Sequence, residues 1–289
     1  VWGTTFLLCI AFAAAAKLQP EVFGRFNFLS RSQTLLPLGA LVATAVVGLV
    51  DDVVDVVSRH GGGLKMLHRL LIYTGIAIVG AYWFYVKLGW TQLHVPFVGD
   101  LDIGAWYIPF FIVVIVATAF SVNEIDGLDG LAGGTLLAAY GTYGVIAFLL
   151  GRYDLATFCA VIVGALLAFL WFNIPPARFF MGDTGAMSLG VTLGIIALLT
   201  NYALLLPIIG VLLVVESLSV IIQVAARRWF GRKVFRSAPI HHHLEAIGWP
   251  EAKIVMRFWV VASVAAAAGL ALFLLDAGGV RFVALPAVS

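Results

Sequence analysis

Long apolar runs separated by short polar segments set the pattern of this chain. Nine runs approach or reach the roughly 17–25 apolar residues that cross a bilayer core of about 30 Å as a helix. Strands of a membrane barrel would instead alternate apolar and polar residues in short segments. The pattern predicts an all-α polytopic membrane protein with about nine transmembrane helices, over residues 1–17, 36–55, 69–87, 105–121, 131–150, 155–172, 186–200, 203–226 and 254–275.

The polar segments between these runs alternate between two faces of the predicted bundle. One face carries or borders eleven Lys and Arg residues and the other six, so the positive-inside rule places the first face in the cytoplasm. The acidic and histidine-rich segments 51–52, 123–130, 173–185 and 237–251 all fall on that face. On the outer face, residues 90–103 alternate apolar and polar positions around Val98-Gly99-Asp100, which predicts a small hairpin beside an aromatic belt.

Composition supports a membrane protein and excludes some functions. Hydrophobic residues make up 62% of the 289 residues and charged residues 11%, whereas soluble domains average about a quarter charged residues. A net charge of +2 without a basic stripe gives no sign of a nucleic-acid partner. Cys9 and Cys159 fall in predicted spans and are expected to be packing residues. No repeat or linker interrupts the chain, so residues 1–289 are expected to form one integral membrane domain.

The segment 173–185 stands out because it breaks the apolar pattern. Two prolines, Pro175 and Pro176, precede Asp183, which lies between two glycines. Such a carboxylate either sits in water without a role or faces a cation. Magnesium is typically held by one or two carboxylates together with substrate phosphates, and zinc would need Cys or His at short fixed spacing. The aspartates that share this face and suit magnesium are Asp51, Asp52, Asp126, Asp129 and Asp183.

Three other polar features carry possible chemistry. Asp51 and Asp52 repel each other unless a cation or proton lies between them, although a helix end that merely reaches water would look the same. The segment 123–130 combines three carboxylates with two glycines, and is either a ligand-binding loop or a hydrophilic connector. Three adjacent histidines, 241–243, suit separate donors to phosphate oxygens, unless they are incidental to a polar loop. Glu216, inside a span, is expected to be structural rather than catalytic.

Carboxylates that hold magnesium, combined with Arg and His that bind phosphate, are the components of phosphoryl transfer. A site at the membrane surface can join a lipid-borne substrate to a soluble nucleotide conjugate. The glycines 61–63 lack the Gly-Lys-Ser/Thr of a phosphate-binding loop, which argues against an ATP-driven pump. An ion-coupled transporter is the alternative from another class, since carboxylates in spans also mark ion paths.

Three segments, 123–134, 172–190 and 237–259, resemble the polyprenyl-phosphate N-acetylhexosamine-1-phosphate transferase superfamily, glycosyltransferase family 4. Within it, the run Ser237–Glu245 with its three histidines, then Gly248-Trp249-Pro250-Glu251, resembles the branch that transfers phospho-N-acetylmuramoyl-pentapeptide. A relative that uses UDP-GlcNAc or another UDP-HexNAc stays open, although the Gly-Trp-Pro-Glu segment disfavours it.

The resemblance implies a magnesium-dependent reaction of UDP-MurNAc-pentapeptide with undecaprenyl phosphate, giving lipid I and UMP in the bacterial inner membrane. It implies that Asp183 binds Mg²⁺, with Asp126 in the metal pocket, and that Asp51 and Asp52 deprotonate or orient the lipid phosphate. It also suggests a homodimer. The residues that it places against the nucleotide, metal or donor phosphates are Asn123, Asp126, Gly127, Asp129, Asn173, Phe180, His241, His242 and His243.

The chain departs from the family pattern at three places. Asp55 stands where a Lys usually follows the acidic pair, and Asn123-Glu124-Ile125-Asp126 replaces the usual Asn-Leu-Thr-Asp. The family's first span and its following Gly-Thr-Pro-Thr-Met-Gly-Gly segment, with a nearby basic residue, are not found, so we expect a chain that is shortened at its N-terminus. Arg69 could replace some of the positive charge of that segment.

Overall fold

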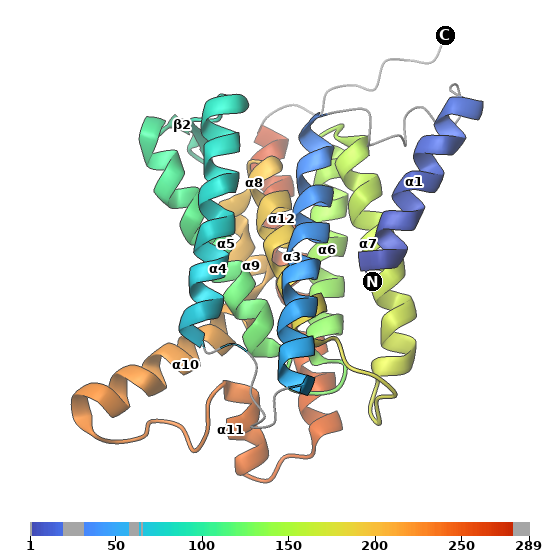
Figure 1. Cartoon of the computed structure of the whole chain (residues 1–289). Coiled ribbons are helices and arrows are strands. Elements are labelled where there is room, and N and C mark those ends of the chain that lie inside the picture. The colour runs from blue at the N-terminus through green and yellow to red at the C-terminus, as the bar shows by residue number, and fades with distance from the viewer. Residues whose placement is uncertain (1, 20–31, 58–63, 65, 280–289) are drawn as a thin grey trace.

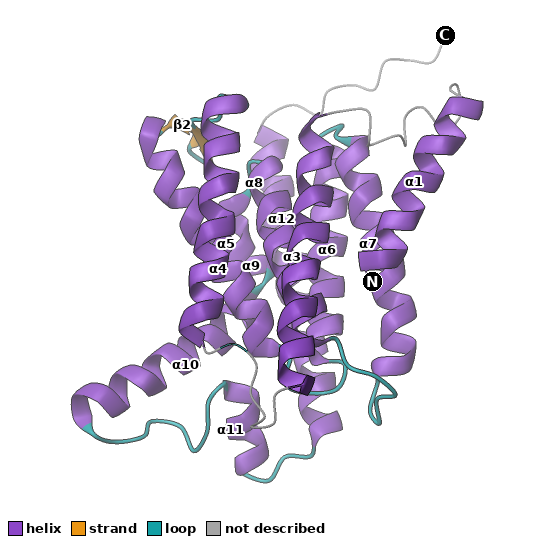
Figure 2. Ribbon diagram, in the orientation of Figure 1, coloured by secondary structure: helices purple, strands orange, loops and turns teal. Residues whose placement is uncertain are grey.

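The computed structural model describes residues 2–19, 32–57, 64 and 66–279, and these residues form a bundle of long helices (Figures 1 and 2). The described part is mostly helical, which confirms the predicted all-α membrane fold. Its long helices are α1 (Trp2–Leu18), α3 (Ser32–Val57), α4 (Met66–Tyr82), α5 (Tyr107–Ile125), α6 (Leu131–Leu149), α7 (Tyr153–Asn173), α8 (Gly182–Leu199), α10 (Val211–Phe230) and α12 (Glu251–Gly279).

Six helical segments of the described residues are long and apolar enough to cross a membrane, and a bent pair of helices would make a seventh. The six are 66–87, 104–125, 131–149, 153–173, 182–199 and 251–278. Helices α1 and α3, which match the first two predicted spans, lie in the same bundle (Figure 1) but are not among the six. The predicted count of nine spans therefore stays a prediction.

Helix α8 is the centre of the bundle, and small residues let its neighbours approach closely. A Cβ atom added at Gly190 of α8 would lie 2.9 Å from the Cα atom of Ala119 in α5. A Cβ atom at Gly48 of α3 would lie 2.4 Å from the carbonyl oxygen of Asp183. Since lipid provides no hydrophobic drive between helices, such close backbone packing is a main source of their association.

The predicted hairpin is present at one end of the bundle. Strands β1 (Gln92–Val95) and β2 (Gly99–Asp102) pair antiparallel, with His94 opposite Asp100. The His94 ring also joins the hairpin to α12, because its Nε2 atom lies 2.7 Å from the Asp276 carboxylate. The Phe97 N–H donates to the same carboxylate at 2.6 Å. The hairpin is thus fixed to the end of the last helix.

The predicted span 203–226 is broken rather than continuous. A short 3-10 turn, η5 (Ala203–Leu205), leads into α9 (Leu206–Ile209), and α10 then turns by 81° after Gly210. Figure 1 shows α10 leaving the bundle at the end opposite the hairpin, close to the short helix α11 (Ile240–Ala246). The break carries the end of α10 and the following loop toward the polar ends of α3, α5 and α8.

Candidate active site

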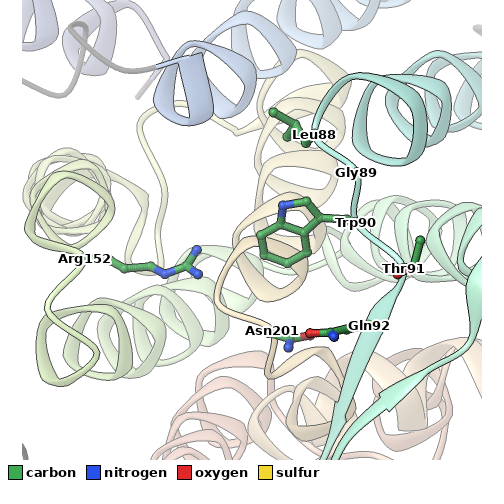
Figure 3. A pocket seen from close by; sticks show the side chains of 7 residues that line it. All are labelled: Leu88, Gly89, Trp90, Thr91, Gln92, Arg152 and Asn201. Atoms are coloured by element: carbon green, nitrogen blue, oxygen red, sulfur yellow. The ribbon is translucent and has the colours of Figure 1, made fainter.

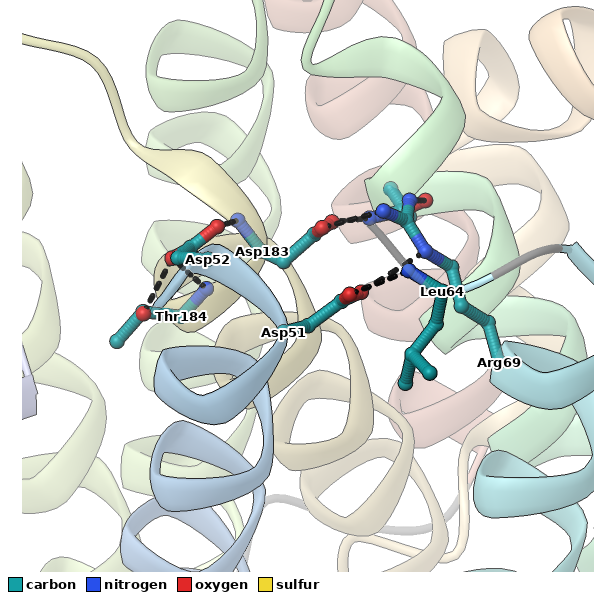
Figure 4. A network of polar contacts seen from close by, with 7 residues as sticks. Asp51, Asp52, Leu64, Arg69, Asp183 and Thr184 are labelled. Carbon is teal, nitrogen blue, oxygen red and sulfur yellow. Dashed lines mark hydrogen bonds and ion pairs between the residues drawn. The ribbon is translucent and has the colours of Figure 1, made fainter. Parts of the chain in front are cut away.

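The start of α8 is held by a carboxylate from a different helix. Asp52, near the end of α3, accepts a hydrogen bond from the Asp183 backbone N–H through Oδ1 at 2.9 Å. Its Oδ2 atom accepts from the Thr184 N–H at 3.0 Å and from the Thr184 hydroxyl at 2.5 Å (Figure 4). The first N–H groups of a helix lack partners within the helix, and a carboxylate there also meets the positive end of the helix dipole. Asp52 therefore fixes the first turn of α8, and Asp183 with it.

This contact between α3 and α8 requires glycine on both sides. Gly48 leaves room for the backbone of Asp183, as described above. Gly182 has a φ of +62° in the left-handed region, and a Cβ atom there would lie 3.0 Å from Asp52 Oδ2. The Gly-Asp-Thr-Gly pattern thus provides the turn that presents Asp183 to the acidic pair.

Arg69, in the first turn of α4, joins three of the predicted site residues. Its Nη2 atom lies 2.5 Å from Asp183 Oδ2, and its Nη1 donates to Asn123 Oδ1 at 2.9 Å. Its Nε lies 3.0 Å from Oδ2 of Asp51, which is fully buried (Figure 4). Asn123 in turn donates to Asp183 Oδ1 at 2.5 Å, and Asp51 Oδ1 accepts from the Leu64 N–H at 2.6 Å. One guanidinium group therefore balances two carboxylates.

Sequence reasoning did not place Arg69 among the site residues. It counted Arg69 as a basic residue on the acid-rich face, and at most as a replacement for the positive charge of a family segment that was not found in this sequence. The signal that could have identified it is a basic residue at the first turn of a predicted span, facing an acidic pair that cannot stay charged near a bilayer without a cation.

Asp126 is the least compensated of the predicted acids. It follows the last residue of α5 and is half-buried. Burial, and then the charges of Asp183 and Asp52, raise the pKa of Asp126 to about 7, against a smaller opposing effect of the Gly182 backbone N–H. A carboxyl group in this state gains from any cation placed between it and Asp183.

Asp129 and Asn173 link neighbouring loops through hydrogen bonds. Asp129 Oδ2 accepts from the Ala177 N–H at 2.9 Å, and its own N–H donates to the Glu251 carboxylate at 2.8 Å. Buried Asn173 accepts from the Gly130 N–H at 2.9 Å and donates to the Phe179 carbonyl at 2.9 Å. Both side chains thus hold the segments 126–130 and 173–182 together beside Asp183.

His241, in α11, packs against the loop 126–130 at Gly127. It is fully buried, and its Nδ1 lies 3.0 Å from the Glu216 carboxylate of α10. Its Nε2 has no hydrogen-bond partner among the described residues, and a Cβ atom at Gly127 would lie 2.3 Å from it. Gly127 is therefore glycine because the imidazole packs on its Cα. Glu216 has the structural part expected from the sequence, since it also accepts from the Ile240 N–H at 3.0 Å.

The other two histidines and Phe180 differ from His241 in their surroundings. His242 is exposed and its Nδ1 lies 2.6 Å from Glu245. His243 Nδ1 accepts from the Arg236 N–H at 3.1 Å, so this ring supports the loop before α11. Phe180 is 75% exposed, and its ring is free to stack on a planar ligand. The rings of His241 and His242 lie 4.2 Å apart, centre to centre, and the predicted contacts of the three histidines with donor phosphates stay a prediction.

The residues present fit a magnesium ion better than a zinc ion. No group of three or more His, Cys, Asp or Glu side chains within the described ranges could hold a metal by itself. Mg²⁺ needs only one or two protein carboxylates when substrate phosphates complete its shell. Asp126, with its raised pKa, and Asp183 could supply such a pair, provided that Asp183 exchanges its bond to Arg69 or to Asn123 for the ion. The fit rests on the uncompensated charge of Asp126 rather than on a preformed cage.

Clustered carboxylates around one guanidinium, at the polar end of a bundle of apolar helices, are typical of an enzyme that transfers phosphate-bearing groups at a membrane. Comparison with known proteins leads to the same class. Residues 34–201 match glycosyl transferase family 4, and the chain belongs to that family. It is thus a phosphotransferase enzyme and a multi-pass membrane protein.

Similar proteins in three bacteria carry the name phospho-N-acetylmuramoyl-pentapeptide-transferase. The protein of Chloroflexus aggregans is 40% identical over 265 residues, which cover 86% of this chain and 72% of the relative. That of Geobacillus kaustophilus is 41% identical over 272 residues, covering 93% and 81%. That of Geobacillus sp. (strain WCH70) is 42% identical over 240 residues, covering 82% and 74%.

Proposed function

We propose that the chain transfers phospho-MurNAc-pentapeptide from its UDP conjugate to undecaprenyl phosphate, giving lipid I and UMP in peptidoglycan synthesis. The observation that carries the proposal is the position of Asp183. It is fixed at the α8 N-terminus by Asp52 and lies against Arg69 and Asn123, at the polar end of the bundle. The names of the relatives support the substrates. The acid-rich face is proposed to be cytoplasmic, where the UDP conjugate is available.

The reaction joins an oxygen of the lipid phosphate to the sugar-bearing phosphorus and breaks the bond from that phosphorus to UMP. A phosphate monoester has a second pKa of about 6, so the attacking oxygen is already ionised near pH 7. The site therefore needs to position two anions more than to remove a proton. Asp52 is a positioning residue in this proposal, because both of its oxygen atoms already accept bonds from the start of α8.

The chain's own residues divide into those that hold the donor and those that hold the site. Asp126 and Asp183 would bind Mg²⁺, which supplies positive charge to the pyrophosphate when it is bound. Exposed Phe180 would stack on the uracil ring. Partly exposed His242 would donate to the phosphates, fully buried His241 would support the loop at Gly127, and Asp51 would keep Arg69 in place. Asp129, Asn173 and His243 would act by shaping the loops.

The proposal is tested by measuring UMP release from purified protein with undecaprenyl phosphate and either UDP-MurNAc-pentapeptide or UDP-GlcNAc, with and without Mg²⁺. D183N should lower kcat by about 10²–10³, the usual effect of removing one group that stabilises a transition state. D102N, at an exposed aspartate in the hairpin, should retain full activity. Transfer from UDP-GlcNAc alone would move the chain to another branch of the family.

An ion-coupled transporter would give a different set of results. Transporters place their ionisable groups near the bilayer midplane, whereas Asp51, Asp52, Asp126 and Asp183 meet at one end of the helices. If D183N abolished uptake of a solute and left UMP release intact, the transferase proposal would be wrong. A homodimer, expected from the family, is tested separately by cross-linking in membranes.

A further inference from the structure

A cavity of about 410 Å³ lies beside the hairpin (Figure 3). The hairpin is at the opposite end of the bundle from α11 (Figure 1). The volume of the cavity falls within the range of roughly 300–1,000 Å³ that is typical of ligand pockets. Exposed Gly89 and Gln92 form part of its edge, so the cavity is open to the outside. None of its residues has a part in the proposed reaction. They are Leu88, Gly89, Trp90, Thr91, Gln92, Arg152 and Asn201.

Arg152 is the only charged residue of this lining. Figure 3 shows its guanidinium group reaching from the start of α7 toward Trp90, and its Cζ atom lies 5.7 Å from the centre of that ring. One N–H of its Nη1 donates to the Leu199 carbonyl at the end of α8. No carboxylate of the described residues lies within 4.0 Å of this guanidinium. Most of its five N–H donors are thus without an anionic acceptor.

The electrostatics of Arg152 favour an anion in the cavity. Burial lowers the pKa of Arg152, and the charge of nearby Asp154 only partly opposes this effect. A cation withdrawn from water gains most from an opposite charge, and the planar guanidinium suits phosphate oxygens in particular. The Trp90 ring lies on one side of the Arg152 side chain, so an anion would approach the guanidinium from another side.

Neutral polar groups complete the lining without competing for Arg152. Asn201 has a φ of 62° and accepts a hydrogen bond from the His94 N–H at 3.2 Å, which fixes it against the hairpin. Gln92, the first residue of β1, and Thr91, just before it, offer side-chain donors. Among the described residues, the lining therefore combines one cation with neutral polar groups and no acid, although the Asn201 amide also donates to nearby Asp100 at 3.5 Å.

If the candidate spans cross the membrane along their length, the cavity would lie near the lipid headgroups. It adjoins the outer ends of the spans, where exposed Trp83 and Trp106 flank Trp90 in the sequence. Trp residues concentrate at the membrane–water interface. A phosphate group of a lipid in that leaflet would thus meet Arg152 without leaving its usual depth.

We propose that this cavity binds the phosphate group of an anionic phospholipid, such as phosphatidylglycerol, from the leaflet on the hairpin side. Binding there would hold together the start of α7, the end of α8 and the segment before the hairpin. A free phosphate ester offers the same chemistry, so the experiment must separate the two sources. If Arg152 serves only as a donor to the Leu199 carbonyl, neither source will bind.

The test is native mass spectrometry of the full chain in detergent with phosphatidylglycerol or phosphatidylethanolamine, and a parallel titration with inorganic phosphate and glycerol phosphate. The variants are R152Q, which removes the cation, and Q92E, which places a carboxylate in the cavity while keeping the Arg152–Leu199 contact. The matched controls are Q92N and R228Q, the latter at an exposed arginine of α10.

Wild type, Q92N and R228Q should retain one phosphatidylglycerol, and R152Q and Q92E should bind it at least about tenfold more weakly, the usual effect of losing one bond to a charged group. Should R152Q fail to fold, Q92E gives the same answer. Binding of the soluble esters but not of phosphatidylglycerol would overturn the proposed lipid and show that the cavity takes a soluble phosphate. Equal lipid retention by all variants, or no binding of either probe, would overturn the proposal.

Discussion

The charge balance around Arg69 leads to a prediction about stability. R69Q leaves Asp51, which is fully buried, and Asp183, whose side chain is 15% exposed, without their shared cation. Removing one partner of a buried ion pair costs about 3–5 kcal/mol. Because the Arg69 side chain is 20% exposed, water screens part of this effect, and we expect a loss of about 2–3 kcal/mol.

A second substitution distinguishes charge repulsion from lost packing. In D51N/R69Q one of the two uncompensated carboxylates is gone, while the amide oxygen introduced at position 51 still accepts from the Leu64 N–H. The double variant should therefore be more stable than R69Q by about 1–2 kcal/mol, within the range of coupling between contacting residues. The measurement is the denaturant midpoint in detergent micelles followed by tryptophan fluorescence, with R228Q as the control of equal charge change.

This account of Arg69 would be refuted if the stability losses of D51N and R69Q were additive in the double variant. If D51N/R69Q loses the sum of the two single effects, Arg69 stabilises the bundle by packing and not by balancing charge. If R69Q lowered stability no more than R228Q does, the ion pairs of Arg69 with Asp51 and Asp183 would contribute nothing to stability.

Three further predictions concern other parts of the molecule. G127A should lower stability by about 1–3 kcal/mol and reduce UMP release, because the added Cβ atom would overlap the buried His241 imidazole. The control is G141A, whose added Cβ atom would have no neighbour within 4 Å, and this variant should be neutral or stabilising. Since the pKa of Asp126 is raised to about 7, the metal-free folded protein binds its proton more tightly than the unfolded chain. The stability that Asp126 contributes should be fully present below about pH 4, the ordinary pKa range of an aspartate. It should be lost as the pH rises through the raised pKa of Asp126. In denaturant titrations, D126N should flatten this pH dependence. Burial alone would lower the pKa of His94, but bonds to its two aspartate partners raise it overall; stability should therefore fall as pH rises above the ordinary His value of about 6.5, and H94Q should remove this step.

The helices and the hairpin could be predicted because each follows from a local pattern. Apolar runs mark helices in lipid, and an alternating run around Val98-Gly99-Asp100 marks two short strands. The break after Gly210 could not be predicted in this way, because apolar residues continue through 203–226 while the chain changes direction by 81°. Hydropathy reports the environment of a segment and carries no information on its direction.

The site was predicted as a set of residue types but not as a set of contacts. Asp52 and Asp183 were expected on one face of the bundle, and the contact between them is a hydrogen bond from the Asp183 backbone N–H to the Asp52 carboxylate. Asp129 and Asn173 were expected to face substrate, and their oxygen atoms are bonded to neighbouring loops. The hydrogen-bond donors that a carboxylate meets come from segments far away in the chain. A local sequence motif therefore does not show which of its oxygen atoms are already bonded.

The loop 126–130 depends on the last helix, and this has a consequence for the order of synthesis. Glu251, the first residue of α12, accepts from the Asp129 N–H, and the Trp259 indole donates to the Gly130 carbonyl at 3.0 Å. The ribosome makes this loop more than a hundred residues before its two supports. The membrane bundle can thus begin to assemble early, but the acidic loop acquires its final shape only when α12 has entered the membrane.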